Sequence, residues 1–175
     1  MSNHLFSPLP ALQELLESNL IFDPASFIRT IKGKKILIIT SCSKEKIKAR
    51  KAKAIDLYSG QLFRSVRKLA FKLNADLAII SAKYGFLRSS QVIETYDRSI
   101  QDLDRTEKEK LHVAISRDLT RLMQEIQYDL VVVILGKAYK ELLRDFDTNI
   151  KFFFIFSPLG IGGYKQLVNK MIEAA

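Results

Sequence analysis

Several residue types and patterns are scarce in this chain of 175 residues, and each scarcity excludes a class of protein. The single cysteine, Cys42, excludes an internal disulfide framework and is typical of a reducing cytoplasm. One cysteine and two distant histidines, His4 and His112, are too few and too far apart for a Cys/His zinc site of the usual spacing. No apolar run approaches the ~20 residues of a membrane helix, and residues 1–10 lack the pattern of a signal peptide. We therefore expect a soluble, cytoplasmic protein with no metal, no cofactor and no membrane partner.

Positive charge is concentrated in one part of the chain. The formal net charge is +9, from 28 Lys and Arg against 19 Asp and Glu. The basic segment from Arg29 to Lys72 contains 14 basic residues and two acidic ones, so it carries +12 and the remainder of the chain −3. Such a segment is typical of a surface that binds a polyanion, and a solubilising face is the alternative interpretation. The candidate nucleic-acid-binding residues within it are Lys48, Arg50, Lys51 and Lys53.

The spacing of apolar residues predicts a helical lead-in over residues 1–31 and one α/β domain over residues 32–175. Residues 10–19 have apolar side chains at helical spacing. Asp23 followed by Pro24 is typical of a capped helix start, which predicts a second short helix up to residue 31. Gly33 then interrupts the helical pattern.

Four apolar runs of strand length follow, at residues 35–40, 76–81, 129–135 and 151–156. None of them alternates apolar and polar residues, which is typical of strands buried on both faces of a parallel sheet. Helical patterns occupy residues 58–73, 106–127, 138–146 and 163–175, and a long polar loop is expected over residues 87–104. Strands that alternate with helices predict a three-layer α/β domain with helices on both faces of a four-stranded, mainly parallel sheet. With the four strands numbered in chain order, the expected order across the sheet is 2-1-3-4.

Small and polar residues follow each of the four expected strands. In open α/β sheets, ligands bind beyond the carboxyl ends of the strands. Helix-start amides and lysines at such places form anion sites, and an aromatic ring such as that of Tyr84 can stack on a nucleobase. The expected substrate-binding residues are Ser41, Ser43, Lys44, Ser81, Lys83, Tyr84, Lys137 and Ser157.

Two further side chains are candidate catalytic residues. Cys42 follows the first strand, where a helix start and Lys44 favour the nucleophilic thiolate, and a small packing residue is the alternative. Asp97 is the leading candidate for a general base because a polar loop can close over a site, and an ordinary turn aspartate is the alternative.

Four short motifs resemble an uncharacterised family of prokaryotic and phage proteins. They are Ser41-Cys-Ser-Lys44, Leu57-Tyr-Ser-Gly-Gln-Leu-Phe63, Ser81-Ala-Lys-Tyr-Gly-Phe-Leu87 and Tyr96-Asp97, in that order along the chain. The resemblance covers the chain from about Ile36 onward. This family is similar in outline to the YaaA-like proteins and, more remotely, to the uracil-DNA-glycosylase-like fold.

The resemblance implies a connection with nucleic acid or with modified bases. Uracil-DNA glycosylases carry an aspartate before Pro-Tyr after their first strand, where this chain has Cys42 and Ser43. Their last strand leads into His-Pro-Ser-Pro-Leu, of which only Ser157-Pro-Leu159 is present here. Because both key catalytic side chains are missing, simple uracil excision is not expected.

The sequence supports three hypotheses about function. The first is an enzyme that acts on a nucleobase or nucleotide, free or within nucleic acid, at a glycosidic or phosphate-linked centre. The second is a non-catalytic nucleic-acid-binding protein that uses the basic segment from Arg29 to Lys72. The third is a nucleotide-binding regulatory domain. In all three the expected partner carries phosphate.

Overall fold

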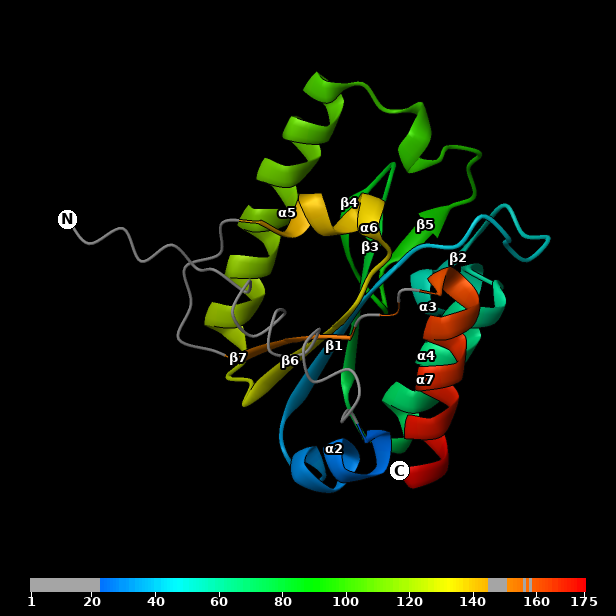
Figure 1. Ribbon diagram of the computed structural model, residues 1–175. Helices are drawn as coiled ribbons and strands as arrows, with labels where there is room; N and C mark the ends of the chain where they lie inside the picture. The colour runs from blue at the N-terminus through cyan, green and yellow to red at the C-terminus, as the bar shows by residue number, and fades with distance from the viewer. Residues whose placement is uncertain (1–22, 145–150, 156, 158) are drawn as a thin grey trace.

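A central sheet separates two layers of helix in this protein (Figure 1). The computed structural model describes residues 23–144, 151–155, 157 and 159–175. The long helix α5 (Arg105–Glu125) covers one face of the sheet, and α4 (Gln61–Lys72) and α7 (Gly160–Ala174) pack together on the other. The α/β architecture expected from the sequence, with helices on both faces of a sheet, is confirmed.

The main sheet has five strands in the order β4-β3-β1-β6-β7. The four expected strands are parallel neighbours in it: β3 (Asp76–Ser81), β1 (Ile36–Ser41), β6 (Leu130–Ile134) and β7 (Lys151–Phe154). The fifth strand, β4 (Gly85–Arg88), is antiparallel to β3 and forms the edge. The predicted four-stranded sheet is therefore not matched exactly. The added strand arises because Gly85, at a φ of +72°, lets the chain fold straight back along β3.

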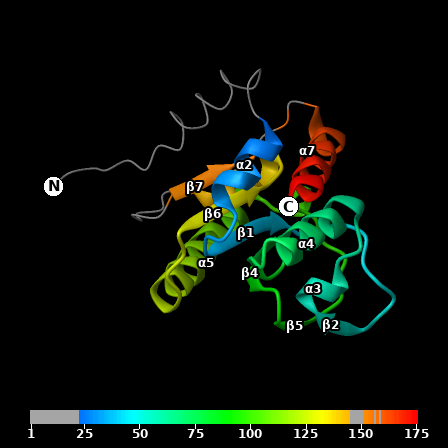
Figure 2. The same cartoon turned by 90° about the horizontal axis from the view of Figure 1, so that it is seen from below.

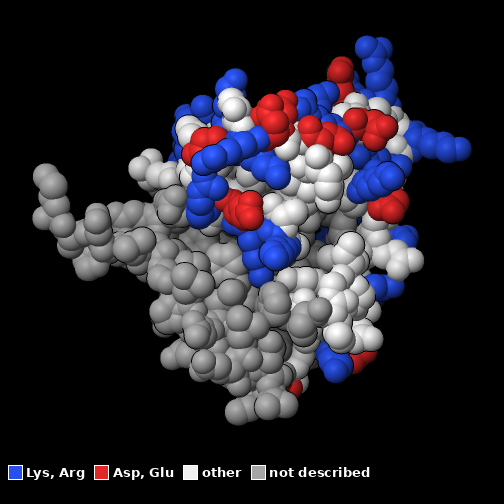
Figure 3. Space-filling view, turned by 45° about the horizontal axis from the view of Figure 1, so that its top comes forward, with Lys and Arg blue, Asp and Glu red and all other residues white. Residues whose placement is uncertain are grey.

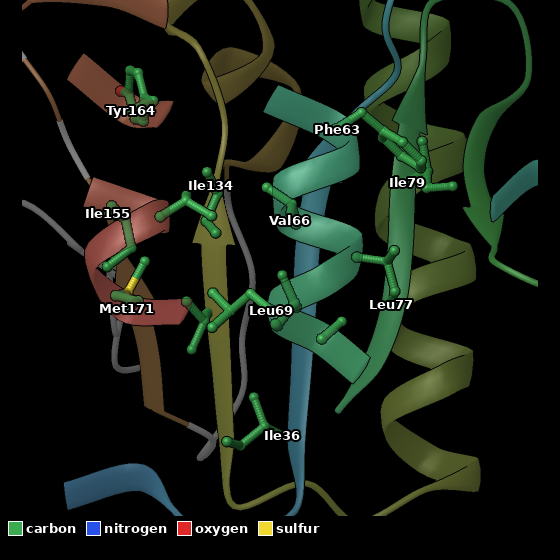
Figure 4. Packing of buried hydrophobic residues seen from close by; sticks show 14 of the residues in the cluster. Ile36, Phe63, Val66, Leu69, Leu77, Ile79, Ile134, Ile155, Tyr164 and Met171 are labelled. Carbon is green, nitrogen blue, oxygen red and sulfur yellow. The ribbon is translucent and has the colours of Figure 1, made fainter. Parts of the chain in front are cut away.

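The parallel strands are buried on both faces, which explains why their sequences are continuously apolar. Ile36 and Ile38 of β1 pack in one cluster with α4 and α7. Leu37 and Ile39 pack in a second cluster with α5. Successive side chains of a strand point to opposite faces, so both faces of β1 need apolar residues. Figure 4 shows the first cluster, with the α4 side chains turned toward the sheet.

The segment expected to be a polar loop, residues 87–104, contains more structure than predicted. It includes most of β4, the short strand β5 (Val92–Glu94) and a 3₁₀ turn, η1 (Ile100–Asp102). The strand β5 pairs in antiparallel fashion with β2 (Lys51–Lys53) to form a separate small sheet. Single buried residues, Ile93 and Ile100, anchor this segment to the body of the protein. Isolated apolar residues of this kind produce no periodic signal.

Four of the predicted helices are present with shifts at their ends, and the segment expected as a helix over residues 138–146 is an exception. The helix α2 (Pro24–Ile31) begins where predicted, with the Asp23 carboxylate accepting a hydrogen bond from the amide of Ala25. A separate short helix, α3 (Ala54–Leu57), precedes α4. The helix expected over residues 138–146 is instead the short α6 (Lys137–Lys140) followed by a 3₁₀ turn, η2 (Glu141–Leu143). The helix expected over residues 10–19 lies outside the described residues. Across the part of the chain that the structure describes, every helix is too short or too polar to cross a membrane.

The Gly85 turn gives a prediction about stability. Replacing Gly85 by alanine places a side chain on a left-handed backbone, while the added Cβ would make only ordinary contacts, at 3.5 Å from the nearest atom. We expect a loss of about 1–2 kcal/mol in the free energy of unfolding, measured by urea denaturation. Gly162→Ala is the control, because Gly162 lies within α7 with open space around it. The control variant should be as stable as the parent or slightly more stable. Equal stability of the two variants would contradict the argument.

Candidate functional site

The carboxyl ends of three neighbouring parallel strands, β1, β3 and β6, meet at Cys42. The Cys42 amide donates a hydrogen bond to the carbonyl of Ile80 in β3, at 2.9 Å. The Cys42 sulfur lies 3.4 Å from the hydroxyl of Tyr139, which lies in α6 just beyond β6. The loop after β1 therefore contacts both neighbouring strand ends. This arrangement follows from the central place of β1 in the sheet.

A chain of three hydroxyl groups lies at the same edge of the sheet. The Tyr96 hydroxyl is 2.7 Å from Ser81 Oγ and 2.8 Å from the Tyr58 hydroxyl. Ser81 Oγ also accepts hydrogen bonds from the amides of Lys83 and Tyr84, at 3.2 and 3.1 Å. Ser81 is fully buried and Tyr58 is 1% exposed. Buried polar groups require such partners, so the chain holds together residues that are far apart in the sequence.

The bonding capacity of a hydroxyl group sets the direction of the first bond in this chain, from Ser81 to Tyr96. A hydroxyl has two lone pairs and one hydrogen. The two amides use both lone pairs of Ser81 Oγ, so its hydrogen is donated to Tyr96. The Tyr96 hydroxyl keeps one lone pair and its own hydrogen, so its bond to the Tyr58 hydroxyl can run in either direction.

Two lysines lie on the tyrosine rings. The Lys46 and Lys83 ammonium groups are 4.4 and 5.6 Å from the centroid of the Tyr96 ring. Lys83 is also 5.1 Å from the centroid of Tyr84, whose ring meets Tyr96 edge to face. Neither lysine has an ion pair among the described residues. The tyrosines attract the ammonium groups through their ring faces, so the two positive charges remain available to an anion.

The tyrosines of the site are held in their neutral form. Burial raises the pKa of Tyr58 to about 12. Burial likewise raises the pKa values of Tyr96 and Tyr139 far above their ordinary value, and negative charge on Cys42 would raise all three further. Cys42 therefore lies within electrostatic range of the whole cluster. At neutral pH the three phenols act as hydrogen-bonding groups and not as bases.

Ser43 and Lys44 differ in what they contribute. Ser43 Oγ donates to the carbonyl of Glu45 at 2.6 Å and accepts from the amide of Gly60 at 3.1 Å. A Cβ on Gly60 would lie 2.6 Å from the Ser43 Cβ, so only glycine fits there. Ser43 therefore builds the loop. The Lys44 side chain is exposed, and Ser41 is the half-buried last residue of β1.

No hydrogen bond or ion pair among the described residues joins two of the predicted site residues, Lys137 and Ser157, to the tyrosine cluster. Lys137 is exposed at the start of α6. Ser157 is buried, and its Oγ accepts a hydrogen bond from the amide of Leu159 at 3.2 Å. A Cβ on Gly163 would lie 1.9 Å from this oxygen, so Ser157 packs against the first turns of α7.

Asp97 lies beside the cluster in the chain but is exposed. It directly follows Tyr96, and no hydrogen bond or ion pair joins its carboxylate to another described residue. The position suits a group that reaches a ligand from outside. Of the described side chains, no group of three or more His, Cys, Asp and Glu is arranged to hold a metal ion.

The four candidate nucleic-acid-binding residues lie on the surface. Lys48, Arg50, Lys51 and Lys53 are all exposed, and Lys51 and Lys53 belong to β2. Figure 3 shows Lys and Arg side chains over the end of the molecule at which the parallel strands finish, with Asp and Glu among them. This end of the molecule is therefore not uniformly positive in this view.

Sequence reasoning did not identify four of the residues in this site as functional candidates: Lys46, Tyr58, Tyr96 and Tyr139. Tyr58 and Tyr96 belong to two of the motifs that carry the family resemblance, and that was the available signal. Lys46 and Tyr139 gave none, because an isolated lysine or tyrosine near a strand end is common on protein surfaces.

The comparison with known families agrees with the presence of an uncharacterised domain. Residues 36–169 match the model of a family of unknown function, DUF6884, and the chain belongs to that family. The match begins at β1 and ends within α7, so it covers all the elements that form the site. No curated protein matches the chain.

The hydroxyl chain gives a second prediction about stability. Tyr96→Phe removes the oxygen between Ser81 and Tyr58 and leaves both without that partner. We expect a loss of about 1–3 kcal/mol in the free energy of unfolding, measured by urea denaturation. Tyr84→Phe is the matched control, because its hydroxyl makes one exposed hydrogen bond, to the carbonyl of Glu94. A Tyr96→Phe loss no larger than that of the control would show that the chain does not stabilise the fold.

Proposed function

We propose that this protein is an enzyme that acts on a nucleobase or nucleotide at the edge where β1, β3 and β6 end. The reaction takes place at a glycosidic or phosphate-linked centre. The observation that carries the proposal is the position of Cys42, which lies against Tyr139 and next to a cluster of neutral tyrosines with two lysines over their rings. The site thus combines a nucleophile, hydrogen-bonding groups, aromatic surfaces and cations.

Each part of the site has a role in this proposal. Lys46 and Lys83 bind the phosphate of the ligand, and the half-buried ring of Tyr84 stacks on the base. Cys42 is the nucleophile, and the neutral Tyr139 hydroxyl lies within hydrogen-bond distance of its sulfur. Asp97 remains the proposed base or orienting group, reaching the ligand from the loop.

Fold resemblance gives additional support. A protein that acts on nucleobases is what the resemblance implies, since the family that the four motifs resemble is similar in outline to the YaaA-like proteins and, more remotely, to the uracil-DNA-glycosylase-like fold. Fold resemblance alone does not establish an activity, because unrelated functions occur on the same fold. The proposal therefore depends on the chemistry of the strand ends.

The test of this proposal is a screen for turnover. Modified and unmodified nucleosides, nucleotides and oligonucleotides are incubated with the protein, and products are detected by mass change. With a substrate found, Asp97→Asn should lower kcat by about 10²–10⁴-fold with ligand affinity nearly unchanged, because an amide cannot accept a proton. Asp118→Asn on α5 is the control and should leave kcat as in the parent. Full activity of Asp97→Asn would remove Asp97 from the mechanism.

Variants of Cys42 and its neighbours decide how the reaction proceeds. Cys42→Ser should cause a large loss of kcat if the thiol is the nucleophile. Tyr139→Phe should lower kcat too. Tyr128 is a buried tyrosine that is hydrogen-bonded to Asp76 on another part of the sheet, so Tyr128→Phe should leave kcat unchanged. Lys83→Met should raise KM, since it removes a charge and keeps the apolar stem. A Cys42→Ser variant with the activity of the parent would contradict the nucleophile role.

A second candidate function, nucleic-acid binding without catalysis, is favoured by the exposure of Lys48, Arg50, Lys51 and Lys53. Among the described residues, no ion pair engages any of these four side chains. They are available to neutralise phosphates, and binding of this kind releases counterions. If no compound changes mass while nucleic acid still binds, this second function replaces the first.

The salt dependence of binding tests the second function. Changing Lys48, Arg50, Lys51 and Lys53 together to glutamine should weaken binding to an oligonucleotide and flatten the dependence of log affinity on log salt concentration. The measurement is fluorescence anisotropy at several salt concentrations. The control variant carries four similar changes in α5, at Arg105, Lys110, Arg117 and Arg121, all of them exposed. No binding at low salt, or equal binding by the two variants, would count against this function.

A further inference from the structure

The helix α4 has apolar side chains on the side that faces the core and a different set of side chains on the side that faces away from it. Phe63, Val66 and Leu69 are buried against the sheet, as Figure 4 shows. On the opposite side Arg64, Lys68 and Phe71 follow each other at intervals of four and three residues, which places them in one stripe along the helix. These three side chains are exposed. The helix therefore carries a basic and aromatic stripe facing away from the core.

Phe71 is the unusual member of the stripe. It is 87% exposed, and no other large apolar side chain of α4 is exposed to a comparable degree. The inward face of α4 already supplies an apolar surface for the core, so Phe71 is not needed there. A flat aromatic ring next to arginine and lysine is the arrangement that proteins use to stack unpaired bases.

Hollows on the surface border the stripe. A groove of about 510 Å³ runs between α4 and α7, which lie side by side (Figures 1 and 2). A second hollow, of about 910 Å³, lies on the other flank of α4 and is lined in part by Phe71. Arg64 and Lys68 line both hollows. An extended chain that crosses α4 would therefore meet the same two cations and then the aromatic ring.

The charges around the stripe favour a polyanion. In the groove, Arg64, Lys68 and Lys165 face one carboxylate, that of Glu173. In the second cavity, Asp56 is already paired with Arg67 at 3.9 Å and Asp76 with Lys35 at 3.5 Å. No ion pair involves Arg64 or Lys68 within the part of the chain that the structure describes. Their charges are left for a partner.

We propose that the stripe of Arg64, Lys68 and Phe71 on α4, with the groove beside it, binds single-stranded nucleic acid. Arg64 and Lys68 contact phosphates, and one base stacks on Phe71. The inference deepens the second candidate function by assigning it a place and a class of nucleic acid. It does not depend on the reaction at the strand ends, because α4 covers one face of the sheet (Figure 1) and its stripe faces away from the core.

A single-stranded partner suits this surface better than a duplex or a membrane. A stacking ring needs an unpaired base, which a duplex does not offer. Membrane binding needs a broad apolar face, whereas Phe71 is the single exposed apolar anchor of the stripe and the groove contains polar side chains such as Asn169.

The test measures the affinity of the full chain for a labelled oligothymidylate of about ten nucleotides by fluorescence anisotropy. Phe71→Ala should weaken binding by about fivefold or more and leave the salt slope unchanged, because it removes stacking and no charge. Phe71→Trp should retain binding. Arg64→Gln with Lys68→Gln should flatten the salt slope by about 0.7 for each phosphate that is no longer neutralised. These opposite signatures separate stacking from charge pairing.

Matched controls lie on α5, across the sheet. Val113→Ala removes an exposed apolar side chain, and Lys110→Gln with Arg121→Gln removes two exposed charges. Both controls should bind as the parent does. Circular dichroism melting checks that each variant is folded. We expect all of them to fold, because Phe71 and its charged neighbours are exposed and their substitution disturbs no core packing.

Four outcomes would overturn the proposal. They are equal affinities of Phe71→Ala and Val113→Ala, equal binding of single-stranded and duplex DNA, competition by polyglutamate as strong as by oligothymidylate, and stronger binding to anionic vesicles than to the oligonucleotide. If the variant at Lys48, Arg50, Lys51 and Lys53 loses affinity while the α4 variants do not, the second candidate function stands and the α4 site fails.

Discussion

The burial of β1 on both faces and along both edges is the constraint on which the rest of this structure depends. Its apolar residues pack alternately toward α5 and toward α4 and α7, and its backbone pairs with β3 and β6. A strand with these requirements can lie only in the middle of the sheet. Its carboxyl end then falls between the ends of its two neighbours. The position of Cys42 between Ile80 and Tyr139 is a direct consequence.

The hydroxyl chain extends this arrangement to the outer loops. Ser81 ends β3, and its buried oxygen is bonded to two amides of the following turn and to Tyr96. Tyr96 in turn reaches Tyr58, which precedes α4. A buried hydroxyl without these partners would be costly, so the chain selects one arrangement of three separate loops. Stability and the geometry of the candidate site are in this way properties of the same bonds.

The sequence was informative about the sheet and much less so about the site. Long apolar runs identify β1, β3, β6 and β7, because burial on both faces leaves a strong local pattern. The strand β4 has only two buried apolar side chains between Gly85 and Arg88, so it leaves no such pattern. The contact between Cys42 and Tyr139 spans 97 positions, and no local rule predicts it. Ser81 was predicted in the site for its place at a strand end, whereas its partner Tyr96 is positioned only by the folded chain.

We propose that a phosphate-bearing base compound binds where β1, β3 and β6 end. The most direct measurement is an NMR titration of the ¹⁵N-labelled protein with mononucleotides, in which backbone amide shifts report where the ligand lies. We expect the largest shifts at the amides of Cys42, Lys83, Tyr84 and Tyr139, with small shifts along α5. Shifts confined to other parts of the surface, or no shifts at millimolar concentrations of any nucleotide, would contradict it.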